Sequence, residues 1–170
     1  TQNMYAIKRE QGMSHEDIMK IIWSSSRDNS RTPMQWDESA NAGFSAVKPW
    51  IGINQNYKEI NVEKQLKDPN SILNFYKKMI SIKKQNDIFT YGSYNLILEE
   101  NEQIYSYTRT LDDEKVIVIC NLSALESVYY HKDIKLSYDN LLLCNYDVHE
   151  HGYITSFVLK PYEARVYRVL

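Results

Sequence analysis

The spacing of hydrophobic residues changes along the chain, and residues 1–26 show the period of an amphipathic helix. The positions that carry this period are Met4, Ile7, Ile18, Ile21 and Ile22. Apolar residues three and four apart lie on one face of a helix. Gly12 interrupts the pattern as a suitable C-cap, and Ser14 restarts it as a suitable N-cap. The pattern therefore predicts two short helices in this region.

Residues 27–70 show neither a helical nor a strand period. About 40 residues without regular structure are uncommon in a compact domain unless they form functional loops. Trp36 and Trp50 lie in this stretch, and Trp23 comes just before it. Because binding residues are concentrated on loops held by a rigid scaffold, we expect a site here.

The clearest helical pattern covers residues 71–86. Its apolar positions are Ile72, Phe75, Tyr76, Met79, Ile80 and Ile82. Four lysines occupy the remaining surface and are expected to face solvent: Lys77, Lys78, Lys83 and Lys84. The pattern predicts a single helix with one apolar face.

After residue 86 the chain is strand-like. Short runs rich in Tyr, Val and Ile cover residues 94–98, 104–110, 115–121, 127–131, 140–146, 154–159 and 164–169. Turn signals separate these runs at intervals of about 8–12 residues, which is typical of an antiparallel sandwich. The predicted fold class is α+β, with helices and loops first and an all-β part second.

Composition excludes several classes of protein. A hydrophobic share of 43% and a charged share of 25% are those of a globular chain rather than a disordered one. The net charge of −2 offers no basic surface for nucleic acid or anionic lipid. The longest apolar runs hold about five residues, far below the roughly 18 that a membrane span needs. We expect neither a nucleic-acid nor a membrane partner.

The start of the chain carries no signal of export. It has neither the basic head nor the apolar stretch of a signal peptide, so a cytoplasmic protein is expected. It also begins without Met and within a helical pattern, which suggests a piece of a longer protein. Cys120 and Cys144 lie in apolar runs and are expected to be buried free thiols.

No metal or cofactor is expected from the residue pattern. His149 and His151 lie close together before Gly152, but a third ligand is missing nearby and a hairpin tip is the better interpretation. No glycine-rich phosphate loop is present, and no spacing suggests a Ser/His/Asp arrangement.

The segment from Ser26 to Asp37 is the sharpest candidate for chemistry. It reads Ser-Arg-Asp-Asn-Ser-Arg-Thr-Pro-Met-Gln-Trp-Asp. Arg27 and Arg31 offer planar donor groups for hydroxyls, carboxylates or phosphates. Trp36 and Trp50 offer flat faces for a sugar ring. The alternative is that Arg27 and Asp28 only hold a long loop in place, with Trp36 as its anchor.

This segment resembles the α-amylase family of glycoside hydrolases. Three further stretches share the resemblance: Asn-Ala-Gly-Phe-Ser (41–45), Lys-Pro-Trp-Ile (48–51) and Asn-Tyr-Lys-Glu-Ile-Asn-Val (56–62). The resemblance is to its oligo-1,6-glucosidase and trehalose-6-phosphate hydrolase branch, and it extends over nearly the whole chain. It implies that residues 1–86 are the last part of a (β/α)₈ barrel and that residues 87–170 are a C-terminal β-sandwich domain.

The resemblance also implies a function and a site. Family members cleave α-glucosidic bonds with retention, using two carboxylates about 5 Å apart. None of the acids here matches the motifs of these carboxylates, so the isolated chain is expected to be inactive. In the family an arginine of this motif contacts the sugar in the −1 subsite. Arg27 matches it best, and Arg31 is the alternative.

The substrate and the role of the β part stay open at this point. The amino-acid sequence of the 26–36 and 50–52 stretches slightly favours trehalose 6-phosphate over isomalto-oligosaccharides as the substrate. The other reading is a non-catalytic β-sandwich that binds carbohydrate or serves only as structure. A sugar-binding role would require exposed aromatic rings grouped on one face of a sheet.

Overall fold

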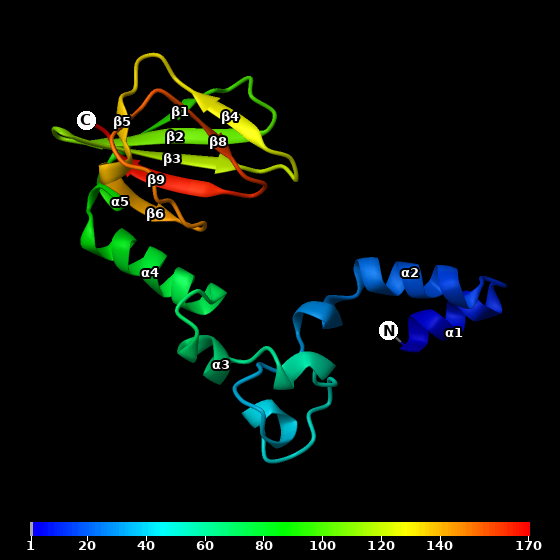
Figure 1. Ribbon diagram of the computed structural model, residues 1–170. Coiled ribbons are helices and arrows are strands. Elements are labelled where there is room, and N and C mark those ends of the chain that lie inside the picture. The colour runs from blue at the N-terminus through cyan, green and yellow to red at the C-terminus, as the bar shows by residue number, and fades with distance from the viewer. Residues whose placement is uncertain (1) are drawn as a thin grey trace. The chain divides into compact units, whose positions relative to one another are not determined.

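The computed structural model describes residues 2–170, apart from the side chain of Asn29 (Figure 1). Residue 1, which the sequence pattern includes in the first helix, lies outside the described residues. The chain divides into two compact units, with the division between Asn74 and Phe75. Among the described residues no helix is long and apolar enough to cross a membrane.

Two helices open the first unit, α1 (Gln2–Glu10) and α2 (His15–Ser25). Gly12 has a φ of 82°, and its N–H reaches the Arg9 carbonyl while the Met13 N–H reaches the Lys8 carbonyl. These two bonds satisfy the last carbonyls of α1 in a Schellman motif. The Ser14 side chain accepts the N–H of Asp17 and caps α2. Both predicted caps are confirmed.

The stretch predicted to lack regular structure contains short helices. They are the 3₁₀ turns η1 (Arg27–Ser30), η2 (Ala40–Gly43) and η3 (Gln55–Lys58), followed by α3 (Val62–Lys67). Elements of four to six residues are too short to show a hydrophobic period, so the sequence pattern could not reveal them. Extended and turn segments link these pieces.

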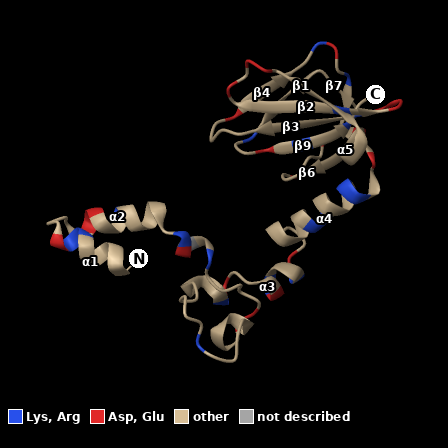
Figure 2. Ribbon diagram, turned by 180° about the vertical axis from the view of Figure 1, so that it is seen from behind, with Lys and Arg blue, Asp and Glu red and all other residues tan. Residues whose placement is uncertain are grey.

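The helix predicted over residues 71–86 is α4 (Ile72–Gln85), and a short helix α5 (Ile88–Tyr91) follows it. The single apolar face predicted for α4 divides into two. Phe75, Met79 and Ile82 line a hollow of about 420 Å³ against the sheet of the second unit, whereas Ile72 is largely exposed. Lys83 also lines this hollow, so it does not simply face away. Figure 2 shows the basic positions of α4, which carries no acidic residue.

The second unit is built from antiparallel strands. They are β1 (Ser93–Ile97), β2 (Ile104–Leu111), β3 (Glu114–Asn121), β4 (Ser127–Tyr130), β5 (Leu136–Ser137), β6 (Leu141–Cys144), β7 (Tyr153–Ile154), β8 (Ser156–Leu159) and β9 (Ala164–Arg168). One sheet has the order β1-β2-β3-β9-β6, and the pairs β4–β8 and β5–β7 form two small sheets. The antiparallel all-β part is thus confirmed, while β5 and α5 are additional to the predicted elements.

The core of the second unit lies between these sheets. Its buried members are Ile104, Ile117, Ile119, Tyr129, Leu136, Ile154, Phe157, Leu159 and Tyr167. The Phe157 ring lies 5.1 Å from that of Tyr129 and 6.2 Å from that of Tyr167, so one aromatic side chain links β4, β8 and β9. The Tyr129 hydroxyl is buried and has no hydrogen-bond partner among the described residues.

A buried ion pair lies beside this core. Arg165 donates from Nε to Glu163 Oε1 at 2.6 Å and from Nη1 to the Tyr167 hydroxyl at 3.1 Å, and its guanidinium lies 4.5 Å from the Phe157 ring centre. Burial disfavours the charged guanidinium, but the hydrogen bonds to Tyr167 and Glu163 outweigh it and raise the pKa of Arg165. Glu163 also accepts the Lys160 N–H at 2.7 Å. The pair fixes the turn that leads into β9.

The two cysteines are free and half-buried. Burial raises the pKa of the Cys120 thiol and that of the Cys144 thiol, so neither resembles a reactive thiolate. The thiols are free, as expected, but they are half-buried rather than buried.

Candidate functional site

The segment from Ser26 to Asp37 leaves the end of α2 through η1. The Ser26 side chain accepts the N–H of Asp28 at 3.3 Å, and the Arg31 N–H reaches the Asp28 carbonyl at 3.0 Å. Ser30 Oγ donates to the Arg27 carbonyl at 3.0 Å. These local bonds form a single tight turn, with Arg27 as its first residue and Arg31 just after its last.

Both arginine side chains are exposed. Neither guanidinium has an ion pair or hydrogen bond to another described residue of the chain. An arginine that only holds a loop would be expected to reach a carbonyl or carboxylate of that loop. Both guanidinium groups therefore face solvent in this structure. The side chain of Asn29, which stands between the two arginines in the sequence, lies outside the described residues.

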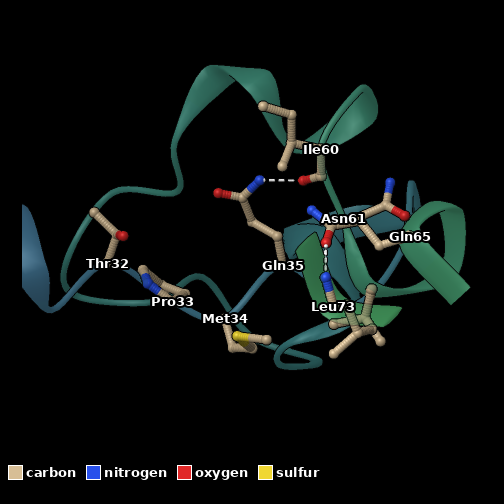
Figure 3. A pocket seen from close by; sticks show the side chains of 9 residues that line it. Thr32, Pro33, Met34, Gln35, Ile60, Asn61, Gln65 and Leu73 are labelled. Carbon is tan, nitrogen blue, oxygen red and sulfur yellow. Dashed lines mark hydrogen bonds between the residues drawn. The ribbon is translucent and has the colours of Figure 1, made fainter. Parts of the chain in front are cut away.

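Gln35 anchors the other end of the segment (Figure 3). Its side-chain amide donates to Asn56 Oδ1 at 3.2 Å and also to the Ile60 carbonyl. Its own carbonyl accepts the N–H of Val62 at 3.0 Å. Three bonds from one residue thus join the segment to the chain some 25 residues later.

The same end of the segment completes helix α3. The Trp36 carbonyl accepts the N–H of Glu63 at 3.0 Å, and Asn61 Oδ1 accepts the N–H of Lys64 at 2.9 Å. Together with the bond from Val62 to Gln35, these contacts satisfy the N–H groups that begin a helix. Helix α3 therefore forms where the candidate segment docks.

Asp37 closes a compact turn with residues 39–43. Its carboxylate accepts the backbone N–H of Ser39 at 2.8 Å and the Ser39 hydroxyl, and these bonds lower the pKa of Asp37. A Cβ on Gly43 would lie 2.6 Å from Asp37 Oδ2. Ala42, which is fully buried and has a φ of 57°, accepts the N–H of Trp36 at 2.9 Å. Asp37 thus has a structural role within the motif.

A groove of about 280 Å³ lies beside Gln35 (Figure 3). Its lining residues are Thr32, Pro33, Met34, Gln35, Ile60, Asn61, Val62, Gln65 and Leu73. Its three amide side chains are already engaged, since Gln65 Oε1 accepts the Leu73 N–H at 3.0 Å and Asn61 donates to the Tyr57 carbonyl at 2.8 Å. This groove is concave, but most of its polar side chains already make hydrogen bonds within the protein.

A second hollow, of about 690 Å³, lies at the start of the segment. Its lining residues are Gln2, Asn3, Ile22, Trp23, Ser26, Asp28, Trp50, Ile51 and Gly52. It joins the first unit's opening helix, the end of α2 and the 50–52 loop. Trp50 lines this hollow and Trp36 lines neither of the two, so neither hollow contains both tryptophans that the sequence pattern grouped as possible sugar-stacking faces.

Sequence reasoning missed the contribution of Trp23 to this hollow. Trp23 lies on α2, where a helical residue next to an apolar stripe looks like part of the stripe. Its exposure of 65% is the signal that it does not pack into a core. The sequence contains no marker that joins Trp23 to Trp50, because that proximity depends on the tertiary fold.

The histidine-containing hairpin behaves as a surface turn. His151 Nδ1 lies 3.4 Å from Asp139 Oδ1, and both side chains are exposed. Among the described residues, no three His, Cys, Asp or Glu side chains gather in a way that could hold a metal ion.

Comparison with known proteins identifies relatives over the whole length of the chain. Residues 1–92 match the family described as "Alpha amylase, catalytic domain". The oligo-1,6-glucosidase of Halalkalibacterium halodurans is 49% identical over 98% of the chain, and the trehalose-6-phosphate hydrolase of Bacillus subtilis is 41% identical over 98%. In both cases the chain covers 30% of the relative.

Solved structures agree with these relatives. The crystal structure of Bacillus licheniformis trehalose-6-phosphate hydrolase superimposes with a TM-score of 0.87 at 41% identity, covering 99% of this chain and 31% of that one. Isomaltulose synthase from Klebsiella sp. LX3 gives a TM-score of 0.83 at 33% identity, covering 95% of this chain and 29% of that one. The chain thus spans about three tenths of the length of the proteins that it matches.

Proposed function

Because this chain belongs to the α-amylase family, on its oligo-1,6-glucosidase and trehalose-6-phosphate hydrolase branch, we propose that it is part of an enzyme that hydrolyses α-glucosidic bonds with retention. Residues 1–86 would form the last part of the catalytic barrel, and residues 87–170 a C-terminal β-sandwich domain. The family match over residues 1–92 covers the first of these parts and extends into the start of the second.

The observation that carries the proposal is the exposed arginine pair on a segment that is bound at both ends. Arg27 would donate hydrogen bonds to hydroxyls of the glucose ring and orient its anomeric carbon towards the nucleophile. Arg31 is the alternative for this role. η1 sets the start of the segment, and Gln35 anchors its end.

The catalytic carboxylates would come from the rest of the enzyme. Retention requires a nucleophile and an acid/base group about 5 Å apart. Asp37 is engaged by Ser39 and closed in by Gly43, which supports a structural rather than a catalytic role. The isolated chain is therefore expected to be inactive.

We consider two classes of substrate for the full-length enzyme. The relatives named oligo-1,6-glucosidase range from 39% to 50% identity, and four of them exceed the 41% of the Bacillus subtilis trehalose-6-phosphate hydrolase, which favours isomalto-oligosaccharides. Trehalose 6-phosphate is the second candidate, supported by the hydrolase of Bacillus subtilis at 41% identity and by the structural match at a TM-score of 0.87.

The deciding experiment measures hydrolysis of isomaltose, trehalose 6-phosphate and p-nitrophenyl α-glucoside by the full-length enzyme and by this chain. Turnover by the full-length enzyme alone is expected. Turnover by the chain would mean that its own carboxylates catalyse the reaction.

The proposed arginine contact has its own test. In the full-length enzyme Arg27→Ala should lower kcat/KM about 10- to 100-fold, the loss that removal of a charged hydrogen bond produces. Arg9→Ala, on the exposed surface of α1, is the matched control and should leave kcat/KM unchanged. If kcat/KM is unchanged in Arg27→Ala but lowered in Arg31→Ala, the sugar contact belongs to Arg31 instead.

A sugar-binding β-sandwich is a second candidate function. The rings of Tyr94 and Tyr105 lie 5.2 Å and 5.6 Å from that of Tyr107, and Tyr94 and Tyr105 are half-exposed. Grouped aromatic rings on one face are the feature that such a role requires. Maltose binding to the chain that is lost in Tyr105→Ala would support it. We expect no binding, because the Tyr94 and Tyr105 hydroxyls already bond each other at 3.0 Å.

A further inference from the structure

The hollow between α4 and the sheet of the second unit has no role in the proposed function. It measures about 420 Å³, which falls within the range of small-molecule sites. Residues of α4 and α5 form one wall, and residues of β2, β3, β6 and β9 form the other. All of its lining residues lie in the second unit. A hollow with helices on one side and a sheet on the other can hold a ligand in a defined orientation.

Most of the lining is apolar. Phe75 and Ile82 line the hollow from α4, and Val118 and Val166 line it from the sheet. These four side chains are half-buried, so part of their surface still contacts solvent. Removing apolar surface from water is favourable. The alkyl part of a ligand would therefore bind favourably in this hollow.

The charged side chains of the lining have one sign. Among the described residues that line the hollow, Lys83 and Arg109 carry positive charge and no carboxylate is present. Burial raises the pKa of the Tyr107 hydroxyl and that of the Cys120 thiol, so both stay uncharged near neutral pH. An anionic group would meet two cations there and no competing anion.

The two cations differ in what they already bind. Arg109 donates from Nη2 to the Gly92 carbonyl at 2.7 Å and from Nε to the Ile88 carbonyl at 3.2 Å, which fixes the end of α5 beside β2. The Lys83 side chain is exposed, and its ammonium group makes no hydrogen bond or ion pair with another described residue. A lysine ammonium is a compact point charge that can pair with a carboxylate. Lys83 is therefore the cation that can bind an anionic head group.

We propose that this hollow binds a small amphipathic carboxylate, such as a medium-chain fatty acid, with its alkyl chain against the sheet and its carboxylate beside Lys83. None of the lining residues belongs to the candidate segment from Ser26 to Asp37. The inference therefore does not depend on the proposed hydrolysis.

The test is a titration of this 170-residue chain with octanoate, followed by NMR of isotope-labelled methionine methyl groups. Met79 lines the hollow, and the other four methionines of the chain do not, so their signals are internal controls. We expect a saturable shift at Met79 with half-saturation at about 1 mM. An absence of shifts up to about 20 mM octanoate, or equal shifts at all five methionines, would overturn the proposal.

The charge of the head group has its own test. Octylammonium has the same alkyl chain and the opposite charge, and it should bind at least about tenfold more weakly than octanoate. Lys83→Gln should weaken octanoate binding about fivefold. Lys84→Gln, which changes an exposed lysine outside the lining, is the matched control and should bind like the parent chain. Equal affinities for the two ions, or equal effects of the two substitutions, would overturn the proposal.

The length of the alkyl chain and the rest of the enzyme provide the last comparison. Decanoate, with two more CH₂ groups to bury, should bind roughly tenfold more tightly than octanoate. The full-length enzyme should show the same Met79 shift, with Met79→Leu assigning the signal. A shift confined to this chain would overturn the proposal, because residues outside the chain would then fill the hollow.

Discussion

At the residue scale, the contact between Gly43 and Asp37 is the tightest constraint on the candidate segment. Gly43 has a φ of 66°, and its missing Cβ leaves the space that the Asp37 carboxylate fills. Gly43→Ala should therefore lower the free energy of unfolding of the first unit by at least about 2 kcal/mol, from the left-handed backbone and the clash together. Chemical denaturation measures the change.

Gly52→Ala is the matched control for this prediction. Gly52 has no heavy atom within 4 Å of its added Cβ, and its φ is not in the left-handed region. A loss of stability at Gly52 as large as that at Gly43 would show that the Asp37 contact is not the cause.

The buried pair of Arg165 and Glu163 leads to a second prediction at this scale. Glu163→Gln leaves the buried guanidinium without its countercharge and should lower the free energy of unfolding by about 3–5 kcal/mol. Glu114→Gln, which breaks the exposed pair with Arg168, should cost less than about 1 kcal/mol. Urea denaturation of both variants checks the difference, and equal losses would contradict it.

The sequence could not indicate this pair. Alternation along residues 164–169 predicts a strand, and it places Arg165 on the same side as the apolar Tyr167. A charged residue on the apolar side of a strand has no explanation in the sequence pattern. The structure explains it, because Arg165 Nε lies 2.6 Å from Oε1 of Glu163, two residues earlier. The turn before β9 creates this proximity.

At the element scale, helix α3 depends on a cap that is buried. Asn61→Ala removes the bond to the Lys64 N–H and the bond to the Tyr57 carbonyl, and should lower the free energy of unfolding by about 1–2 kcal/mol. Asn54 stands at the equivalent position before η3 but makes no capping bond. Asn54→Ala should therefore be close to neutral in the same thermal unfolding measurement. If the two variants are equally unstable, capping does not explain the role of Asn61.

Elements were predictable from the sequence in proportion to their length. The periods of α1, α2 and α4 and the alternation of β2 and β3 are long enough to identify each element. Helix α3 has six residues and β5 has two, and both form because distant groups complete them. For α3 these groups are the carbonyls of Gln35 and Trp36, which no local pattern reveals.

At the scale of the whole molecule, the two units should unfold in separate steps. The first unit buries few large side chains, whereas the second unit contains the nine-residue core cluster. The backbone amides of α1 and α2 should therefore exchange with deuterium at a lower urea concentration than those of β2 and β3. Coincident transitions would contradict independent units.

The family could be identified from the sequence, but the hollow could not. The 26–62 motifs carry the resemblance because they are long and specific, and the relatives confirm it. The arginines stand within these motifs, so they could be named in advance, and their role stays a prediction. The Trp23–Trp50 hollow requires the fold, since its walls come from three separate segments.

The Tyr129 hydroxyl, which has no hydrogen-bond partner among the described residues, has a consequence for sequence variation. Phenylalanine fills the same space in the core and removes a buried oxygen that costs about 1–3 kcal/mol when unpaired. In a library of single substitutions screened for heat resistance, Phe at position 129 should be enriched over Tyr. Depletion of Phe there would reveal that the oxygen has a bonding partner. If Phe is enriched, Tyr129 is a residue that lowers stability, and selection for activity alone has no reason to replace it.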